Sequence, residues 1–180
     1  MSDNVDATRV RDCLAGDPRA FAALVEQYER PVYNVALRML RNAEDARDIA
    51  QSVFMKAWLN LSSYDPKYKF YSWIYRMAIN ESLNVLRSRG REGEPVDERL
   101  PTEDAGPADV LAAGQSREAV LAAVRRLKPE HRSVIVLRYF VDLPYEDIAE
   151  ALELDSKTVK SRLYTARQLL KDQLAARGVA

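Results

Sequence analysis

Residues 144–171 read PYEDIAEALELDSKTVKSRLYTARQLLK, and this stretch decides the fold of the C-terminal part of the chain. We expect a short helix over 144–152, a tight turn over 153–155 and a longer helix that begins at Ser156. The apolar residues that would let the two helices bury one another are Ile148, Ala149, Leu152, Val159 and Leu163. Their three- and four-residue spacing within each helix predicts a helix-turn-helix.

The second helix of this motif has a polar side opposite its apolar side. The apolar side consists of Val159, Leu163, Ala166 and Leu170, and the polar side consists of Lys157, Lys160, Ser161, Tyr164 and Gln168. Cationic donors, a hydroxyl group and an aromatic ring suit the phosphates and base edges of a DNA major groove. A solvated helix in a helical adaptor protein is the alternative interpretation.

The composition of the whole chain favours two small helical domains. The 180 residues include 27 Lys plus Arg and 27 Asp plus Glu, and at 47% apolar residues each half can bury a core. None of the six glycines falls within 17–89 or 115–177, and strand-like alternation is absent from both windows. Between them, 90–114 is rich in Gly, Pro and acidic residues, which is typical of a flexible linker.

The expected fold class is therefore all-α, with two small helical domains joined by a flexible acidic linker. The expected boundaries are 1–91 for the first domain, 92–116 for the linker and 117–180 for the helix-turn-helix domain. Helix starts are indicated at Asp17-Pro18, Pro31, Asn42, Phe70, Lys128-Pro129, Leu143-Pro144 and Asp155-Ser156.

Several classes of function have no support in the sequence. A single cysteine, Cys13, and a single histidine, His131, argue against a disulfide framework, a metal site and a His-based catalytic centre. We find no phosphate-binding glycine loop and no nucleophile elbow. The longest apolar run, 119–124, is too short to span a membrane, and the N-terminus lacks a signal sequence. We expect no cofactor, no metal, no enzyme activity and a cytoplasmic location.

The helix expected over 43–61 has a second face that is not purely polar. At 100° per residue the core face consists of Ala46, Ile49, Ala50, Val53, Phe54, Ala57 and Trp58. The opposite face carries Asp48, Ser52, Met55 and Leu59. A mixture of acidic, polar and apolar side chains there indicates a protein partner. Scattered exposed apolar residues are common, so an unpartnered surface is the alternative.

Aromatic and basic residues alternate over 64–91. The aromatic residues are Tyr64, Tyr68, Phe70, Tyr71, Trp73 and Tyr75, and Lys67, Lys69 and Arg76 lie between them. Such a mixture suits stacking on unpaired bases together with phosphate contact. Further along the expected helix, a polar stripe consists of Arg76, Asn80, Asn84, Arg87 and Arg91. The alternative is that some aromatic residues are core, and the spacing of Phe70, Trp73, Ile74 and Met77 favours this for Trp73.

Three segments together resemble a bacterial extracytoplasmic-function (ECF) sigma factor, a two-domain class of the housekeeping-sigma superfamily. Residues 45–58, DARDIAQSVFMKAW, resemble the family's core-polymerase-binding helix. Residues 70–91, FYSWIYRMAINESLNVLRSRGR, resemble its promoter-melting helix. Its −35-reading helix-turn-helix is resembled by LPYEDIAEALELDSKTVKSRLYTARQLL (143–170). The resemblance implies a promoter-specificity subunit with three partners, which are core RNA polymerase, promoter DNA and an anti-sigma protein.

The resemblance, together with the faces described above, assigns an expected role to each group of residues. The polymerase-binding group is Asp48, Gln51, Ser52, Met55 and Leu59. The −10 group is Tyr64, Lys67, Tyr68, Lys69, Phe70, Arg76, Asn80, Asn84 and Arg87. The −35 group is Lys157, Thr158, Lys160, Ser161, Arg162, Tyr164, Thr165 and Arg167. The acidic linker resembles the segment that such factors thread through the RNA path of the polymerase.

The chain departs from the family pattern at three positions. Arg47 and Ser52 stand where the family usually has an acid, and Glu153 occupies a turn position that is often glycine. Two other functions stay open from the residues alone. A stand-alone helix-turn-helix regulator would explain the C-terminal part, and a helical adaptor would bind protein only.

Overall fold

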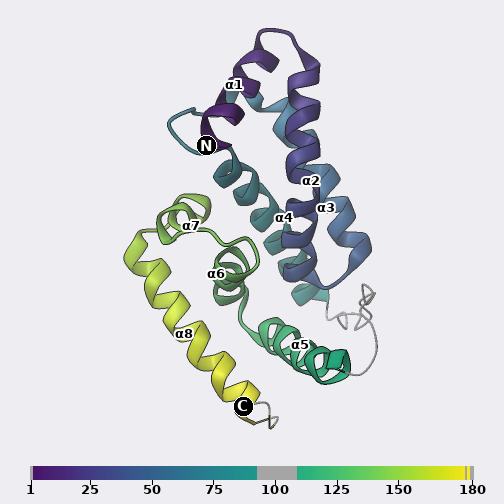
Figure 1. Cartoon of the computed structure of the whole chain (residues 1–180), viewed down its shortest axis with the longest axis vertical. Coiled ribbons are helices and arrows are strands. Elements are labelled where there is room, and N and C mark those ends of the chain that lie inside the picture. The colour runs from purple at the N-terminus through teal and green to yellow at the C-terminus, as the bar shows by residue number, and fades with distance from the viewer. Residues whose placement is uncertain (1, 93–108, 177, 179–180) are drawn as a thin grey trace.

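The computed structural model describes residues 2–92, 109–176 and 178, and every regular element in these residues is a helix (Figure 1). The N-terminal domain contains α1 (Ser2–Leu14), α2 (Pro18–Leu40), α3 (Ala43–Leu59), the 3₁₀ turn η1 (Leu61–Ser63) and α4 (Phe70–Glu92). The C-terminal domain contains α5 (Asp109–Arg126), α6 (Pro129–Tyr139), α7 (Tyr145–Leu152) and α8 (Ser156–Ala175). The predicted all-α class is confirmed.

Side-chain caps set the starts of three helices where the sequence predicted them. The carboxylate of Asp17 accepts from the backbone N–H of Arg19 at 2.9 Å, directly before α2. The amide oxygen of Asn42 accepts from two N–H groups at the start of α3. Asp155 accepts from the N–H of Thr158 at 2.7 Å, at the start of α8. Each cap satisfies donors that have no partner inside the helix.

Pro31 does not begin a helix, contrary to the sequence prediction, because α2 runs through it from Pro18 to Leu40. A proline inside a helix removes one backbone hydrogen bond and costs about 3 kcal/mol. The turns on either side bury Tyr28, Val32 and Val35 almost completely. Burial of such side chains contributes about 1.5–3 kcal/mol each, so the packed face keeps the helix continuous.

The structure differs from the predicted linker mainly at its C-terminal end. Helix α4 continues past Gly90 to Glu92, and α5 begins at Asp109, inside the range 92–116 that was expected to be linker. Ala112, Ala113 and the long side chains near them favour a helix over the predicted coil. Residues 93–108, which hold most of the predicted linker, lie outside the described residues.

Two ion pairs fix α3 against α4 in the N-terminal domain. Lys56 on α3 lies 2.5 Å from the carboxylate of Glu81 on α4, and Arg89 on α4 lies 2.5 Å from the carboxylate of Asp45. Beneath them Val53 and Ile74 are fully buried. The orientation of α3 is therefore set along its length, which determines which of its side chains reach the surface.

The helix-turn-helix turns at Glu153, which adopts a left-handed conformation with φ 53° and ψ 45°. This is the position that the family often fills with glycine, and a side chain there costs roughly 1–2 kcal/mol. Its backbone N–H still bonds the carbonyls of Ala149 and Glu150, which ends α7 and directs the chain into α8. The predicted turn geometry is therefore kept despite the substitution.

The two domains pack against each other, with α4 contacting α7 and α2 contacting α6. We call this packing the closed arrangement. Figure 1 shows α6 lying between α4 and α8, so that α8 forms an outer side of the molecule. The guanidinium of Arg38 on α2 lies 4.6 Å from the ring centroid of Phe140, which adds a cation–π contact between the domains.

Arg132 on α6 is a buried cation that joins the two domains. Its Nη1 donates to the carbonyl of Met39 near the end of α2 at 2.5 Å, and its Nη2 donates to the carbonyls of Arg125 and Leu127. Burial lowers the pKa of Arg132 to about 10. The guanidinium therefore stays charged at neutral pH and is held by backbone carbonyls.

The substitution Arg132→Leu is expected to lower the free energy of unfolding by about 2–4 kcal/mol, because three carbonyls lose a charged donor. Urea unfolding followed by circular dichroism measures this loss. Arg126→Leu on the exposed side of α5 removes the same charge and is the matched control. Equal midpoints for the two variants would contradict the structural role of Arg132.

Candidate nucleic-acid and protein-binding surfaces

The outer side of α8 presents the polar residues that the sequence predicted to be exposed. Val159, Leu163 and Ala166 are buried, and Tyr164 on the opposite side is 62% exposed. We define the α8 face as Lys157, Lys160, Ser161, Tyr164 and Thr165, which are all exposed. The face combines cations, hydroxyls and a phenol on one side of a helix, which is the chemistry of major-groove contact.

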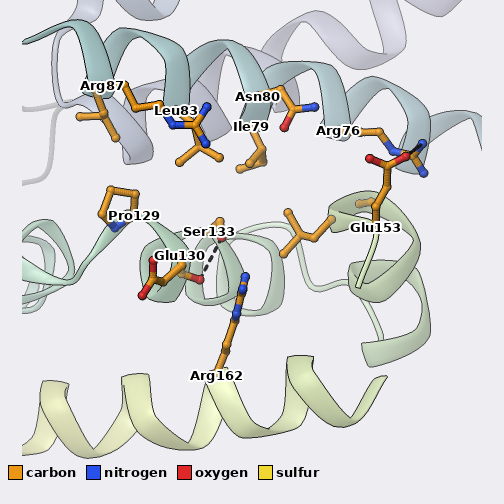
Figure 2. Close-up of a pocket in the computed structure, with 13 residues that line it drawn as sticks. Arg76, Ile79, Asn80, Leu83, Arg87, Pro129, Glu130, Ser133, Glu153 and Arg162 are labelled. Carbon is orange, nitrogen blue, oxygen red and sulfur yellow. Dashed lines mark hydrogen bonds and ion pairs between the residues drawn. The ribbon is translucent and has the colours of Figure 1, made fainter. Parts of the chain in front are cut away.

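Three residues of the predicted −35 group do not lie free on this face. The backbone N–H and hydroxyl of Thr158 both donate to the carboxylate of Asp155, the N-cap of α8, so the cap occupies the Thr158 hydroxyl. These bonds lower the pKa of Asp155. Arg162 points from α8 toward α6 (Figure 2). Arg167 is exposed, but a hydrogen bond with the hydroxyl of Tyr139 raises the pKa of its guanidinium.

The outer side of α3 is more apolar than the sequence predicted. Met55 and Leu59 are 58% and 70% exposed, and Asp48 and Gln51 are exposed beside them. Ser52 is half-buried. Trp58 was expected in the core, but it is 47% exposed. We define the α3 face as Asp48, Gln51, Met55, Trp58 and Leu59.

Trp58 lies at the edge between the buried and the exposed sides of α3. One edge of its ring system packs on Phe21 of α2, with ring centroids 5.1 Å apart and planes at 68°. The rest of the indole remains in contact with solvent. Large aromatic residues that are partly supported and partly exposed are common anchors of protein interfaces. The α3 face therefore has the composition of a docking site.

Two residues of the predicted −10 group belong to the core. Tyr64 is only 8% exposed, its ring packs on Phe70 and Trp73, and its hydroxyl donates to the carbonyl of Tyr68 at 2.6 Å. Phe70 is also buried. The prediction that these two side chains contact DNA is therefore wrong for the closed arrangement. The aromatic cluster instead closes the loop that precedes α4.

Five other residues of the −10 group remain at the surface. Lys67 and Tyr68 are exposed in the loop, with the ammonium of Lys67 5.7 Å from the Tyr68 ring centroid. We define the α4 edge as Asn80, Asn84 and Arg87, which are exposed along the helix. Arg87 donates to the amide oxygen of Asn84 at 3.3 Å.

The two remaining cations of the −10 group are paired with α7. The ammonium of Lys69 lies 3.0 Å from both carboxylate oxygens of Asp147. The guanidinium of Arg76 lies 2.8 Å from the carboxylate of Glu153 and donates to the carbonyl of Glu150 at 2.7 Å. The sequence missed this contact. An acid in the first turn of a helix is explained by the helix dipole, and Asp147 gave no further signal.

A pocket of about 380 Å³ lies beside this contact, between α4 and the helix-turn-helix domain (Figure 2). Its floor is apolar, with Ile79 and Leu83 from α4 and Leu152 from α7. Its rim carries charges of both signs, which are Arg76, Arg87, Glu130, Glu153 and Arg162. The pocket has no group of residues arranged for acid–base or nucleophilic chemistry.

Within the described ranges, no cluster of His, Cys, Asp and Glu side chains has the arrangement of a metal site. His131 is half-buried and Cys13 is buried, and burial raises the pKa of the Cys13 thiol. In the part of the chain that the structure describes, no helix is both long enough and apolar enough to cross a bilayer.

Two family models match the chain, one in each domain. Sigma-70 region 2 matches residues 24–92, which contain the α3 face and the α4 edge. Sigma-70 region 4 matches residues 117–170, which contain the helix-turn-helix. The chain therefore has the two conserved regions of an RNA polymerase sigma factor, a class that directs polymerase to promoters.

Similarity to individual proteins narrows the class. The chain is 31% identical over 177 residues to the ECF RNA polymerase sigma factor SigW of Bacillus subtilis (strain 168), covering 92% of this chain and 95% of SigW. It is 35% identical over 181 residues to the ECF sigma factor SigE of Mycolicibacterium smegmatis, covering 97% of this chain and 70% of SigE. A solved structure of CnrH with the cytosolic domain of CnrY matches with a TM-score of 0.75 at 26% identity. The match covers 96% of this chain and 98% of the CnrH chain. The chain belongs to the ECF sigma factors.

A tyrosine of α4 gives a pH-dependent test of the packing. Burial raises the pKa of Tyr75 to about 12. An unfolded tyrosine ionises near pH 10, so the contribution of neutral Tyr75 to stability is complete below pH 10 and is lost as pH rises to about 12. Between these pH values the free energy of unfolding should fall by about 2–3 kcal/mol more in the wild type than in Tyr75→Phe. Parallel curves from urea titrations would contradict this burial.

Proposed function

We propose that this chain binds core RNA polymerase through the α3 face and contacts promoter DNA through the α8 face, the α4 edge and the loop before α4. The observation that carries the proposal is the presence, in one chain, of an exposed apolar face and of a helix-turn-helix with an exposed polar helix. A stand-alone regulator would not require the exposed apolar face, and a helical adaptor would not require the helix-turn-helix. The chain supplies recognition and strand opening, and the polymerase supplies the chemistry, so we propose no enzyme activity for it.

The α3 face is the proposed polymerase contact. Leaving Met55, Trp58 and Leu59 in water forgoes about 1.5–3 kcal/mol of burial energy for each side chain. A partner surface that covers them recovers this energy. Asp48 lies beside them and offers a charge to a basic group of the partner.

The α8 face is the proposed −35 contact. Lys160 and Tyr164 lie near its centre and can reach base edges, whereas Lys157 at the start of the helix is suited to a phosphate. Thr158 donates to the Asp155 cap of α8, and Arg162 points toward α6. We do not assign either of these two to base recognition.

The loop and the α4 edge are the proposed −10 contact. The exposed ring of Tyr68 can stack on an unpaired base, which is worth roughly 1–3 kcal/mol. Lys67 and Arg87 can neutralise phosphates of the same strand. Lys69 and Arg76 can contact the same strand only when their ion pairs with Asp147 and Glu153 are broken.

We further propose a cytoplasmic location, where the polymerase acts, and an anti-sigma partner. Support for the partner comes from CnrH, a similar structure that was solved with the cytosolic domain of CnrY. The family resemblance predicts the same kind of control for this chain.

The first test concerns the polymerase contact. The double change Asp48→Ala with Leu59→Ser should weaken binding to core RNA polymerase at least roughly hundredfold, because it removes a charge and an apolar anchor from one interface. Co-purification and fluorescence anisotropy with core polymerase measure the effect.

The matched control places the same two chemical changes on α1. Asp12 and Leu14 are exposed there, so Asp12→Ala with Leu14→Ser should leave polymerase binding unchanged. Thermal melting should be the same for both variants. Full polymerase binding by the α3 variant would place the contact elsewhere on the molecule.

The second test concerns the −35 contact. Lys160→Ala or Tyr164→Ala should each cost about 1–3 kcal/mol of promoter binding by the holoenzyme, if the side chain reads a base edge. A promoter obtained by transcribing genomic DNA with the holoenzyme is the template, and core polymerase affinity should be unchanged. An equal loss on promoters with intact and scrambled −35 elements would assign the residue to a phosphate instead.

A further inference from the structure

The sulfur-containing side chains differ sharply in how far they are exposed to solvent. Met55 on α3 is 58% exposed, whereas Met39 is fully buried and Met77 is half-buried against the core. The thiol residue Cys13 is only 8% exposed. Among the residues that the structure describes, Met55 therefore carries the sulfur that a dissolved oxidant reaches most easily.

The thiol of Cys13 is a poor competitor for such an oxidant. Burial raises the pKa of Cys13, which lowers its thiolate fraction, and the thiolate is the form that oxidants attack. A thioether has no proton to lose, so its oxidation depends on access to the sulfur. Burial thus protects the thiol twice, while the exposed thioether on α3 stays reactive.

Met55 also lies at the centre of the α3 face. Gln51 is one helical turn before it and Leu59 one turn after it, and both are exposed. Trp58, three residues further along the helix, is 47% exposed. A partner that covers Leu59 and Trp58 therefore covers Met55 too, and must receive it as an apolar side chain.

We propose that Met55 is an oxidation site, and that its conversion to methionine sulfoxide weakens the binding of core RNA polymerase to the α3 face. The inference rests on the proposed function of that face. In the reaction the thioether sulfur attacks one oxygen of hydrogen peroxide, and the O–O bond breaks. The sulfur is oxidised by two electrons and keeps this oxygen, while the peroxide is reduced and its other oxygen leaves as water after taking up the proton of the transferred hydroxyl.

The added oxygen changes the chemistry of the contact. A sulfoxide is polar and accepts hydrogen bonds, whereas the thioether is nearly apolar. Burying the sulfoxide in an apolar contact removes its hydrogen bonds with water, which corresponds to a loss of roughly tenfold to hundredfold in affinity. The change is reversible, because a thiol-dependent sulfoxide reductase releases the oxygen as water while two thiols form a disulfide.

The experiment oxidises the full chain with hydrogen peroxide until peptide mass analysis shows that Met55 carries one oxygen. The chain is then labelled at its N-terminus, and its binding to core RNA polymerase is followed by fluorescence anisotropy. Met55→Leu is the matched variant, because leucine keeps an apolar side chain of similar volume without sulfur.

Each protein is compared with its own untreated form. Oxidised wild type should bind roughly ten to a hundred times more weakly than untreated wild type. Treatment should leave the affinity of Met55→Leu unchanged, whatever its starting value. Met77→Leu keeps Met55 and should lose affinity as the wild type does. Sulfoxide reductase should restore binding by the wild type.

Full binding by wild type that carries the oxygen on Met55 would overturn the proposal. An equal loss in treated Met55→Leu, or oxidation of Met77 or Cys13 before Met55, would overturn it as well. The untreated double variant Asp48→Ala with Leu59→Ser separates the two levels of the account. Weak binding by this variant, with no effect of oxidation, would retain the polymerase contact and reject the oxidation site. Full binding in both cases would reject the α3 face as the contact.

Discussion

The buried carboxylate of Asp147 is the constraint on which the arrangement of the two domains depends. A carboxylate withdrawn from water costs several kcal/mol unless charged and hydrogen-bonding partners surround it. Its partners, Lys69 and Tyr71, belong to the other domain. These contacts fix the orientation of α7 relative to the start of α4. The tight turn at Glu153 then fixes the orientation of α8 relative to α7.

This constraint separates the surfaces of the molecule into two groups. The α3 face and the α8 face point outward and need no rearrangement to meet a partner. The cations at the start of α4 are instead held between the domains. Binding to polymerase can therefore precede contact with the −10 strand, and the strand contact requires that an existing set of ion pairs be exchanged for a new one.

The exchange is feasible because the ion pairs differ in their degree of burial. Arg76 and Glu153 are near the surface, where a pair contributes at most about 1 kcal/mol. The Asp147 carboxylate is nearly buried, whereas that of Glu153 is exposed, so the pair with Lys69 holds the domains more firmly. Arg132 adds neutral carbonyl contacts that do not compete with nucleic acid. The closed arrangement thus combines a few polar contacts with apolar packing between the domains, and a large polymerase interface can outweigh them.

Much of this account could be predicted from the sequence, because the signals involved are local. Capping residues placed the starts of α2, α3 and α8, and helical periodicity placed Lys160 and Tyr164 on the outer side of α8. The exposed Met55 and Leu59 followed from the same argument on α3. The three motifs also identified the family.

What the sequence did not predict depends on contacts between distant residues. Tyr64 resembled a loop residue available for stacking, but its ring completes a cluster with Phe70 and Trp73. Helical periodicity assigned Trp58 to the core face, but its ring packs edge-on against Phe21 and leaves it 47% exposed. Asp147 looked like a helix-dipole acid because its partner Lys69 lies far away along the chain. Pro31 looked like a helix start because the packing that sustains α2 is tertiary.

The most direct test of the account is the distance between the domains in the free chain and in the promoter complex. Spin labels at Ala22→Cys on α2 and Gln168→Cys on α8, in a Cys13→Ser background, report this distance by electron paramagnetic resonance. All three labelling changes avoid the α7 contact. We expect one distance in the free chain and a longer one in the complex with core RNA polymerase and promoter DNA. An unchanged distance in that complex would contradict the exchange of α7 for DNA at Lys69 and Arg76.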